Sequence, residues 1–381
     1  MEFKKLRRRF YKQEEFASGY APLYARLFGL LAKWADGGVS DPVMSWLMDV
    51  GNGRSAFDIP LLLVAALHRD VLMDISEAAK LATYYPTVGG SADWQSPKFE
   101  TTLREIMLAR RDAFTPFIQT ATVQTNETGR GLVWILPLLL TRWEAVHLVD
   151  LGASAGLNLV ADQRAFRLVD EDIQTIADLG KGTPPQFQTI CQNWSQHSPL
   201  TTHHFPQILS RTGCDIAPFG LETAVSEHTL ASFIWADHPP RLTRLREGIT
   251  AFRQVSQSDA PVQLHQTTLP DGLPQFLQKV PQTSDPVLIY NTYMTVYLPD
   301  KGISMWSHIN EWALQQNRPV LWLQWEPLWG GPHPAPPEFG WCAWMVDWWQ
   351  AGQHKQWQFA WVHPHGTKAQ FLLPMQQKFN L

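Results

Sequence analysis

One stretch decides how this chain folds: Ala145-Val146-His147-Leu148-Val149-Asp150-Leu151-Gly152-Ala153-Ser154-Ala155-Gly156-Leu157-Asn158. Its apolar first half is typical of a strand that is covered on both faces. Gly152 and Gly156 allow the backbone to turn tightly and to approach a ligand closely. The first turn of a following helix presents free N–H groups to an anion. The stretch therefore predicts a buried strand, a ligand-binding turn and a helix.

Three interpretations of this turn are open. The first is a nucleotide-binding turn of the form D/E-x-G-x-G-x-G, found in S-adenosylmethionine-dependent methyltransferases, with Ser154 in the place of the middle glycine. The second is the nucleophile elbow G-x-S-x-G of α/β-hydrolases, which Gly152-x-Ser154-x-Gly156 matches literally. The third is a turn between strand and helix that only packs.

Composition restricts the class of protein. The chain has 381 residues, of which 45% are hydrophobic, and this suits one large globular domain with an additional segment. The net charge of −4 gives no basic field, so we expect no nucleic-acid partner. Cys191, Cys214 and Cys342 lack metal-ligand spacing, so we expect no metal site. No apolar run is long enough for a membrane span, which predicts a cytoplasmic protein without a membrane partner.

The chain before the glycine turn has the pattern of helices. Apolar residues recur at helical spacing over 21–34 and 59–68, and Asp41-Pro42 supplies an N-cap residue and a first helical residue. Further helices are expected over 77–85 and 103–117. We therefore predict an α-helical N-terminal segment, or lid, over residues 1–130.

No convincing strand precedes Val146, and residues 178–205 have the composition of a long loop or insertion. First strand, glycine turn, helix is the nucleotide-binding order, whereas the elbow strand of a hydrolase lies in mid-sheet. We therefore expect an α/β fold over residues 131–381, a Rossmann-like sheet of the methyltransferase type with an antiparallel C-terminal hairpin. Its later segments are expected over 208–218, 262–265, 286–290 and 319–325, and its hairpin strands over 358–363 and 368–373.

Several motifs together resemble the domain of unknown function 2332 family of bacteria, over nearly the whole chain. The resemblance implies a methyltransferase-like fold, and it implies no established reaction. The motifs that carry it are Tyr84-Tyr85-Pro86-Thr87-Val88-Gly89-Gly90, Gln124-Thr125-Asn126-Glu127 with Arg130, Gly152-Ala153-Ser154-Ala155-Gly156-Leu157-Asn158-Leu159, Arg211-x-Gly213-x-Asp215-x-x-Pro218, and Trp235-x-Asp237 with Arg241.

In the methyltransferase interpretation, acids and small residues at the strand ends hold S-adenosylmethionine. Asp150 would orient the methionine ammonium, and an acid after the second strand would bind the ribose hydroxyls. Asp215 is preferred for the second role over Asp170, which has the more usual spacing. Threonine stands where an adenine-binding acid is expected, so Thr268 is the candidate there. The remaining candidates for the cofactor are Asn126, Arg130, Gly152, Ser154, Gly156 and Asn158.

Methyl transfer needs alignment and the removal of one proton. Asn291 and Tyr293, which follow the fourth strand, would face the reacting methyl group. Glu127 and His333 are candidate bases, and the tryptophan-rich segment 325–333 is a candidate acceptor pocket. The acceptor would be a small molecule of unknown identity.

Two other classes of function remain open. A serine hydrolase would use Ser154 as nucleophile, with a later base and acid in the chain order Ser, Asp, His. The candidate bases are His363 and His365, and the candidate acids are Asp215, Asp237 and Asp347. A protein that binds a nucleotide or an adenosine metabolite without chemistry would also fit the missing adenine acid.

Overall fold

The structure is a computed structural model that describes residues 2–124, 127–182, 185, 187–194, 205–327 and 335–372. The chain divides into two compact units. The first comprises Met1–Asn126 and Leu221–Thr243, and the second comprises Glu127–Gly220 and Arg244–Leu381. The sequence-based division at residue 130 did not anticipate that a segment from the α/β region belongs to the helical unit.

The first unit is helical, as the apolar periodicity predicts. The expected cap at Asp41 is present, because its side chain accepts hydrogen bonds from the backbone N–H groups of Val43 and Met44. The helices are α1 (Phe3–Ser18), α2 (Pro22–Asp36), α3 (Pro42–Val50), α4 (Ile59–Leu72), α5 (Ala79–Ala82), α6 (Pro97–Ala109), α7 (Arg111–Thr120) and α9 (Ala224–Ser232), with 3₁₀ turns η1 (Ser76–Ala78) and η2 (Pro86–Val88).

Two of the expected helices differ from the structure. The helix expected over 77–85 is a 3₁₀ turn followed by the single turn of α5, and the proline at position 86 disfavours helix only in the last residue of the expected range. The helix expected over 103–117 is divided between α6 and α7. The break lies at Arg110, whose guanidinium donates to the buried carboxylate of Asp70 at 2.7 Å.

The segment 221–243 is held in the first unit by contacts with residues that are far away in the sequence. The first residues of α2 have no local capping side chain, and Asp237 accepts hydrogen bonds from the backbone N–H groups of Leu23 (2.8 Å) and Tyr24 (3.3 Å) instead. The Trp235 ring stacks on Tyr24 with centroids 5.0 Å apart. The Trp235-x-Asp237 motif therefore acts as a distant N-cap for α2.

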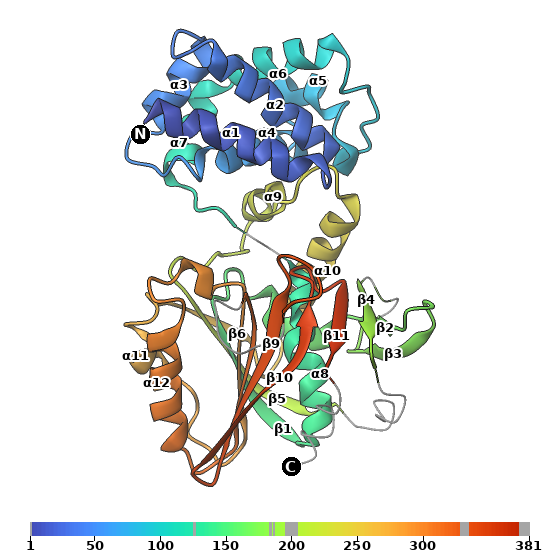
Figure 1. The fold of residues 1–381 in the computed structure, drawn as a ribbon, viewed down its shortest axis with the longest axis vertical. Helices are drawn as coiled ribbons and strands as arrows, with labels where there is room; N and C mark the ends of the chain where they lie inside the picture. The colour runs from blue at the N-terminus through green and yellow to red at the C-terminus, as the bar shows by residue number, and fades with distance from the viewer. Residues whose placement is uncertain are drawn as a thin grey trace. The chain divides into compact units, whose positions relative to one another are not determined.

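The second unit is built on one mixed sheet, which confirms a mixed α/β fold (Figure 1). The strand order is β3-β2-β4-β11-β10-β9-β8-β7-β1-β5-β6. The strands are β1 (Ala145–Leu151), β2 (Phe166–Val169), β3 (Thr175–Leu179), β4 (Phe187–Gln192), β5 (Gln207–Asp215), β6 (Val262–Gln266), β7 (Val287–Thr292), β8 (Val320–Glu326), β9 (Cys342–Gln350), β10 (Gln353–Val362) and β11 (Lys368–Phe371). The helices are α8 (Leu132–Thr141), α10 (Pro239–Val255), which also enters the first unit, α11 (Leu273–Leu277) and α12 (Ile303–Leu314), with 3₁₀ segments η3 (Thr128–Gly131), η4 (Leu157–Gln163) and η5 (Thr295–Tyr297).

The five strands β6, β5, β1, β7 and β8 are parallel, and both faces of this part of the sheet are covered. Helix α8 packs on the face that carries Leu148 and Tyr290. Helices α11 and α12 pack on the opposite face, which carries Val149 and Ile289 (Figure 1). Of the helices that the structure describes, none has the length and apolar character that a membrane span requires.

The sheet extends further than the sequence suggested. Strand β4 lies within the region expected to be a loop, and β3 ends in its first two residues. Strand β9 was not expected because every residue from Cys342 to Trp349 is buried, which removes the alternation that marks a strand. The antiparallel hairpin of β10 and β11 is confirmed. The helix expected after the glycine turn is the 3₁₀ segment η4, with a non-helical Val160 inside it.

His68 gives the first unit a testable pH dependence. Its ring is fully buried, with Nε2 2.8 Å from the Thr87 hydroxyl and Nδ1 3.3 Å from the Ser232 carbonyl oxygen. Burial is the largest cause that lowers the pKa of His68 to about 4. The unfolded chain, with a pKa of about 6.5, therefore binds the proton that the folded chain resists.

We expect the free energy of unfolding to fall as the pH drops from 6.5 to 4, by up to about 1.4 kcal/mol per pH unit from His68. Urea unfolding at several pH values measures this slope. The His68→Gln variant should have a shallower slope in this window, while the control His308→Gln on α12, with a partly exposed ring, should keep it. An unchanged slope in His68→Gln would contradict the assignment.

Candidate functional site

Strand β5 presents three motif residues toward the turn that follows β1. Arg211, Gly213 and Asp215 alternate along the strand, so they occupy one face. A Cβ atom at Gly213 would lie 2.7 Å from the Cβ of Ala153, so only glycine lets the turn pack here. The carboxylate of Asp215 accepts the backbone N–H of Ser154 at 2.9 Å and that of Ala217 at 2.9 Å. Asp215 therefore fixes the glycine turn against β5.

Arg211 holds η4 in the same way. Its guanidinium forms a bidentate pair with the carboxylate of Asp162, with N–O distances of 2.6 and 2.8 Å, and it also donates to the carbonyl of Leu159. Both charged side chains are almost completely buried. A buried pair with this geometry is costly to break, because removal of one partner leaves the other charge unpaired. The pair therefore locks the segment after the turn onto β5.

The turn itself contains three residues with positive φ: Gly152 (+88°), Ser154 (+50°) and Gly156 (+73°). A Cβ atom at Gly152 would lie 3.1 Å from the Cβ of Met294, so the Met294 side chain packs over the first glycine. A Cβ atom at Gly156 would lie 3.0 Å from Val262 on β6. In this conformation both glycines permit close packing of neighbouring side chains, as the third interpretation of the turn requires.

Asp150 is the penultimate residue of β1 and is 4% exposed. Burial raises the pKa of Asp150 to about 8, and the negative charge of Asp215 adds to this effect. An interaction with the hydroxyl of Tyr290 on β7 acts in the opposite direction. The carboxyl group is therefore mostly protonated at pH 7, and a cation placed beside it would favour its ionised form.

The carboxyl ends of β7 and β8 are joined by a buried network around Glu326. The amide of Asn291 donates to the Glu326 carboxylate at 2.7 Å, and the backbone N–H groups of Met294 and Thr295 donate to it at 2.9 and 3.1 Å. The indole of Trp322 in turn donates to the Asn291 carbonyl at 2.7 Å. Burial raises the pKa of Glu326. Both Asn291 and Glu326 therefore shape the loop after β7.

That loop turns sharply at Tyr293, a non-glycine residue with φ of +55°. The backbone N–H of Tyr293 donates to the carbonyl of Trp325 at 2.8 Å. The Arg130 guanidinium lies over the Tyr293 ring, 5.2 Å from its centroid, and its Nε donates to the carbonyl of Pro364 at 2.9 Å. Tyr293 thus contacts Arg130, while the next residue, Met294, covers Gly152.

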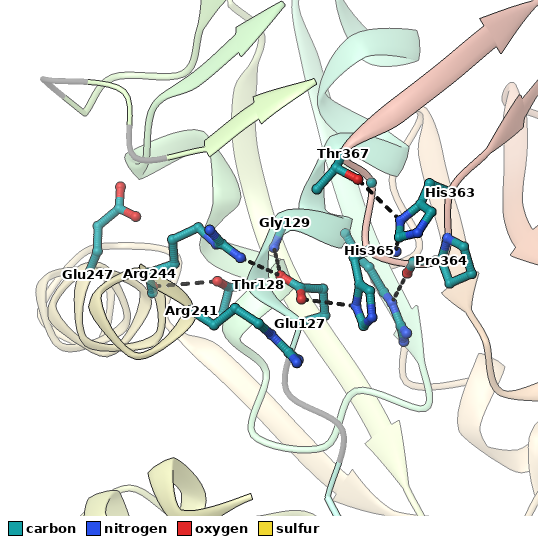
Figure 2. A network of polar contacts seen from close by, with 12 residues as sticks. Glu127, Thr128, Gly129, Arg241, Arg244, Glu247, His363, Pro364, His365 and Thr367 are labelled. Carbon is teal, nitrogen blue, oxygen red and sulfur yellow. Dashed lines mark hydrogen bonds and ion pairs between the residues drawn. The ribbon is translucent and has the colours of Figure 1, made fainter. Parts of the chain in front are cut away.

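Figure 2 shows Glu127 between two basic side chains. The Glu127 carboxylate lies 3.1 Å from Nδ1 of His365 and 3.9 Å from the guanidinium of Arg244, and it accepts the backbone N–H of Gly129 at 3.3 Å. Glu127 is 3% exposed. The backbone N–H of His365 donates to Nδ1 of His363 at 3.2 Å, which fixes the turn between β10 and β11. The structure therefore brings Glu127, Arg130, Tyr293 and His365 to the same edge of the sheet.

The remaining sequence candidates lie apart or outside the described residues. Asn158 is the second residue of η4, and its carbonyl accepts the Trp134 indole N–H at 2.8 Å. Thr268 is exposed, two residues beyond β6. Asp170 bonds backbone N–H groups in the turn between β2 and β3, far along the strand order from β1 and β5. Asn126 and His333 lie outside the described residues.

The partners proposed for a serine hydrolase have other contacts. Asp215 bonds the backbone of Ser154, Asp237 caps α2, and Asp347 lies 2.9 Å from His354. His365 does have a carboxylate partner, but this partner is Glu127. The arrangement does not favour a triad on Ser154.

Sequence reasoning gave no individual role to two residues of this edge, although one of them, Glu326, lies in the segment 325–333. Glu326 anchors the loop after β7, and Arg244 on α10 approaches Glu127. A signal for Glu326 exists in the sequence, because it lies at the carboxyl end of a buried apolar strand as Asp150 and Asp215 do. No local signal marks Arg244, which is one of several basic residues on its helix.

Comparison with known proteins agrees with the motif pattern. Residues 7–370 match the model of a family described as an uncharacterised protein conserved in bacteria, domain of unknown function 2332. The chain belongs to this family. No curated protein and no solved structure matches it. Membership of the domain of unknown function 2332 family therefore names no reaction.

Asp150 makes the stability of this family member depend on pH. Its folded pKa of about 8 lies above the unfolded value of about 3.9, so its contribution is fully present below pH 3.9 and is lost as the pH rises through 8. The neutral variant Asp150→Asn should not lose this contribution. We expect its unfolding free energy, relative to wild type, to rise by up to about 1.4 kcal/mol per pH unit between pH 4 and 8.

Urea unfolding of both proteins at pH 5, 7 and 9 measures this difference. The control variant Asp172→Asn, at the exposed turn between β2 and β3, should follow the wild type at each pH. If the difference in unfolding free energy between Asp150→Asn and the wild type were the same at pH 5 and pH 7, the assignment of a buried, protonated carboxyl group to Asp150 would be wrong.

Gly213 should tolerate no side chain. We expect Gly213→Ala to lower the free energy of unfolding by about 1–3 kcal/mol, because the added methyl group would overlap the Cβ of Ala153. Gly19→Ala is the control, since no heavy atom lies within 4 Å of its added Cβ. Urea unfolding compares the two variants, and equal stabilities would contradict a packing constraint at Gly213.

Proposed function

We propose that this protein binds S-adenosylmethionine at the glycine turn and directs transfer of its methyl group to a small-molecule acceptor. The proposal includes a sheet of the Rossmann-like methyltransferase type. It is supported by the parallel order β6-β5-β1-β7-β8, in which β5 and β6 lie on one side of β1 and the later strands β7 and β8 lie on the other. Ligands in such sheets bind at the carboxyl ends of the strands, beside this reversal. The glycine turn, Asp215 and Tyr293 are all at that edge.

The observation that carries the proposal is the placement of Asp215. Each of its carboxylate oxygens accepts one backbone N–H, so the group is fixed beside the turn, and each oxygen keeps a further lone pair for a ribose hydroxyl. Asp150 is one strand away and would receive the methionine ammonium. When bound, the cofactor supplies an electrophilic methyl group on a sulfonium centre. The protein residues would bind and orient it, and exclude water from it.

The methionine end of the site requires one adjustment. The Met294 side chain packs over Gly152, where a cofactor would approach the turn. Methionine is unbranched and flexible, so it can change rotamer at small cost.

A protein that binds an adenosine metabolite without chemistry is the second candidate function. It is favoured by the contact of Met294 with the turn and by threonine in place of an adenine-binding acid.

Calorimetric titration with S-adenosylmethionine and with S-adenosylhomocysteine tests the proposal. We expect saturable one-to-one binding that is lost in Asp215→Ala and strengthened in Met294→Ala. Ser154→Ala should bind normally, because Asp215 contacts only the backbone N–H of that residue. Absence of heat and of thermal stabilisation with both ligands would overturn the proposal, since ligand at about 100 times its Kd should add about 2.7 kcal/mol.

Binding should also release a proton. Asp150 holds its proton at pH 7, and an adjacent ammonium group would lower the pKa of Asp150, so binding should release about one proton. Titrations at pH 7 in two buffers of different ionisation enthalpy measure this number. Asp150→Asn should release none. Transfer of a labelled methyl group to a small-molecule fraction then separates an enzyme from the second candidate.

A further inference from the structure

The Glu127–His365 pair places a histidine nitrogen beside a fixed carboxylate. Nδ1 of the histidine lies 3.1 Å from the Glu127 carboxylate, and this negative charge favours the tautomer that carries its proton on Nδ1. The basic lone pair then belongs to Nε2. Glu127 is held in turn by the backbone N–H of Gly129, and the His365 side chain is 27% exposed. The pair therefore combines a fixed carboxylate with a ring that solutes can reach.

Guanidinium groups surround this pair. Arg244 lies 3.9 Å from Glu127, and Arg130 reaches the carbonyl of Pro364, the residue before His365. Arg164 donates to the carbonyl of Thr128 and to Glu247 at 3.0 Å. Among the described residues of the second unit, we define this cluster, together with His365, by three guanidinium groups and two carboxylates, those of Arg130, Arg164, Arg244, Glu127 and Glu247. Clusters of guanidinium groups recognise carboxylates and phosphates, which they can bind through two parallel hydrogen bonds.

The cluster is continuous with the proposed cofactor site. The Arg130 guanidinium lies over the ring of Tyr293, and the adjacent Met294 packs on Gly152. A Cβ atom at Gly131 would lie 2.3 Å from the Cβ of Ala161 on η4, so the segment after Glu127 packs directly on the segment after the glycine turn. A molecule bound beside His365 would therefore lie along the same edge of the sheet as a cofactor on that turn.

We propose that this cluster is the acceptor site: it binds a small molecule that carries a carboxylate or phosphate group, with Arg130 and Arg244 as its ligands, and His365 as the base. This inference rests on the proposed methyl transfer. The lone pair of the acceptor nitrogen or oxygen forms the new bond to the methyl carbon, and the electron pair of the broken carbon–sulfur bond stays on sulfur. The acceptor proton passes to Nε2 of His365. Glu127 is the positioning residue.

Oxyanion binding is tested first, without any cofactor. Thermal unfolding of the full chain is followed with increasing inorganic phosphate, and separately with malonate, at an ionic strength held constant with chloride. Phosphate and malonate represent the two possible acid groups of the acceptor. We expect at least one of them to raise the Tm saturably in the wild type.

In Arg130→Gln and Arg244→Gln, the apparent affinity for the anion, obtained from the rise in Tm, should be at least tenfold weaker than in the wild type. The control is Arg167→Gln, since Arg167 pairs with Asp178 at 2.8 Å on the β2–β3 hairpin. Arg130→Lys keeps the charge and serves if Arg130→Gln does not fold. An unsaturable response in the wild type, or equal responses in wild type and folded Arg130 variants, would overturn the acceptor site. S-adenosylmethionine binding is measured separately, so the proposed function can survive that outcome.

The base is tested by nitrogen NMR of the histidine rings at pH 8. We expect His365 in the Nδ1–H tautomer and His363 in the Nε2–H tautomer, because Nδ1 of His363 accepts the backbone N–H of His365. In Glu127→Gln the His365 preference should weaken while that of His363 stays. An Nε2–H tautomer for His365 in the wild type would overturn its assignment as a base oriented by Glu127.

Discussion

The structure of this edge of the sheet depends on one face of β5. Arg211, Gly213 and Asp215 are two residues apart, and each constrains a different part of the chain that leaves β1. Asp215 fixes the backbone of Ser154, Gly213 admits Ala153, and Arg211 holds η4 through Asp162. A strand is a suitable template for this purpose, because its side chains on one face are spaced regularly and its backbone is fixed by neighbours on both sides.

A second constraint acts from the other side of β1. Glu326 collects donors from Asn291, Met294 and Thr295, and a buried carboxylate is tolerated only where such donors surround it. Its contacts determine where the loop after β7 goes, and with it Tyr293 and Met294. The glycine turn is thus held by β5 on one side and by a loop anchored on β8 on the other. Met294 joins the two.

Burial gives the ionisable groups at this edge unusual properties. The pKa of Asp150 is raised to about 8, and the pKa of His363 is lowered to about 4 by burial and by the neighbouring His365. Both shifts oppose charge, as expected where water is excluded. Where water is excluded, the electrostatic interaction between the protein and a charge that a ligand brings is stronger than in water. Paired charges such as Arg211–Asp162 are kept because they satisfy each other.

The sequence by itself determined the strand and glycine turn at 145–156, the Arg211–Asp215 motif, the strands at β7 and β8, and the family. These features are local, because a strand, a turn or a cap depends on residues a few positions apart. Only the tertiary structure decided that 221–243 joins the helical unit, that β9 extends the sheet, and that Glu127 meets His365. Asp237 and Leu23 are 214 residues apart in the chain, and no periodicity connects positions at such a distance. The hydrophobic pattern also fails for β9, where both faces are covered and the alternation that would mark a strand is absent.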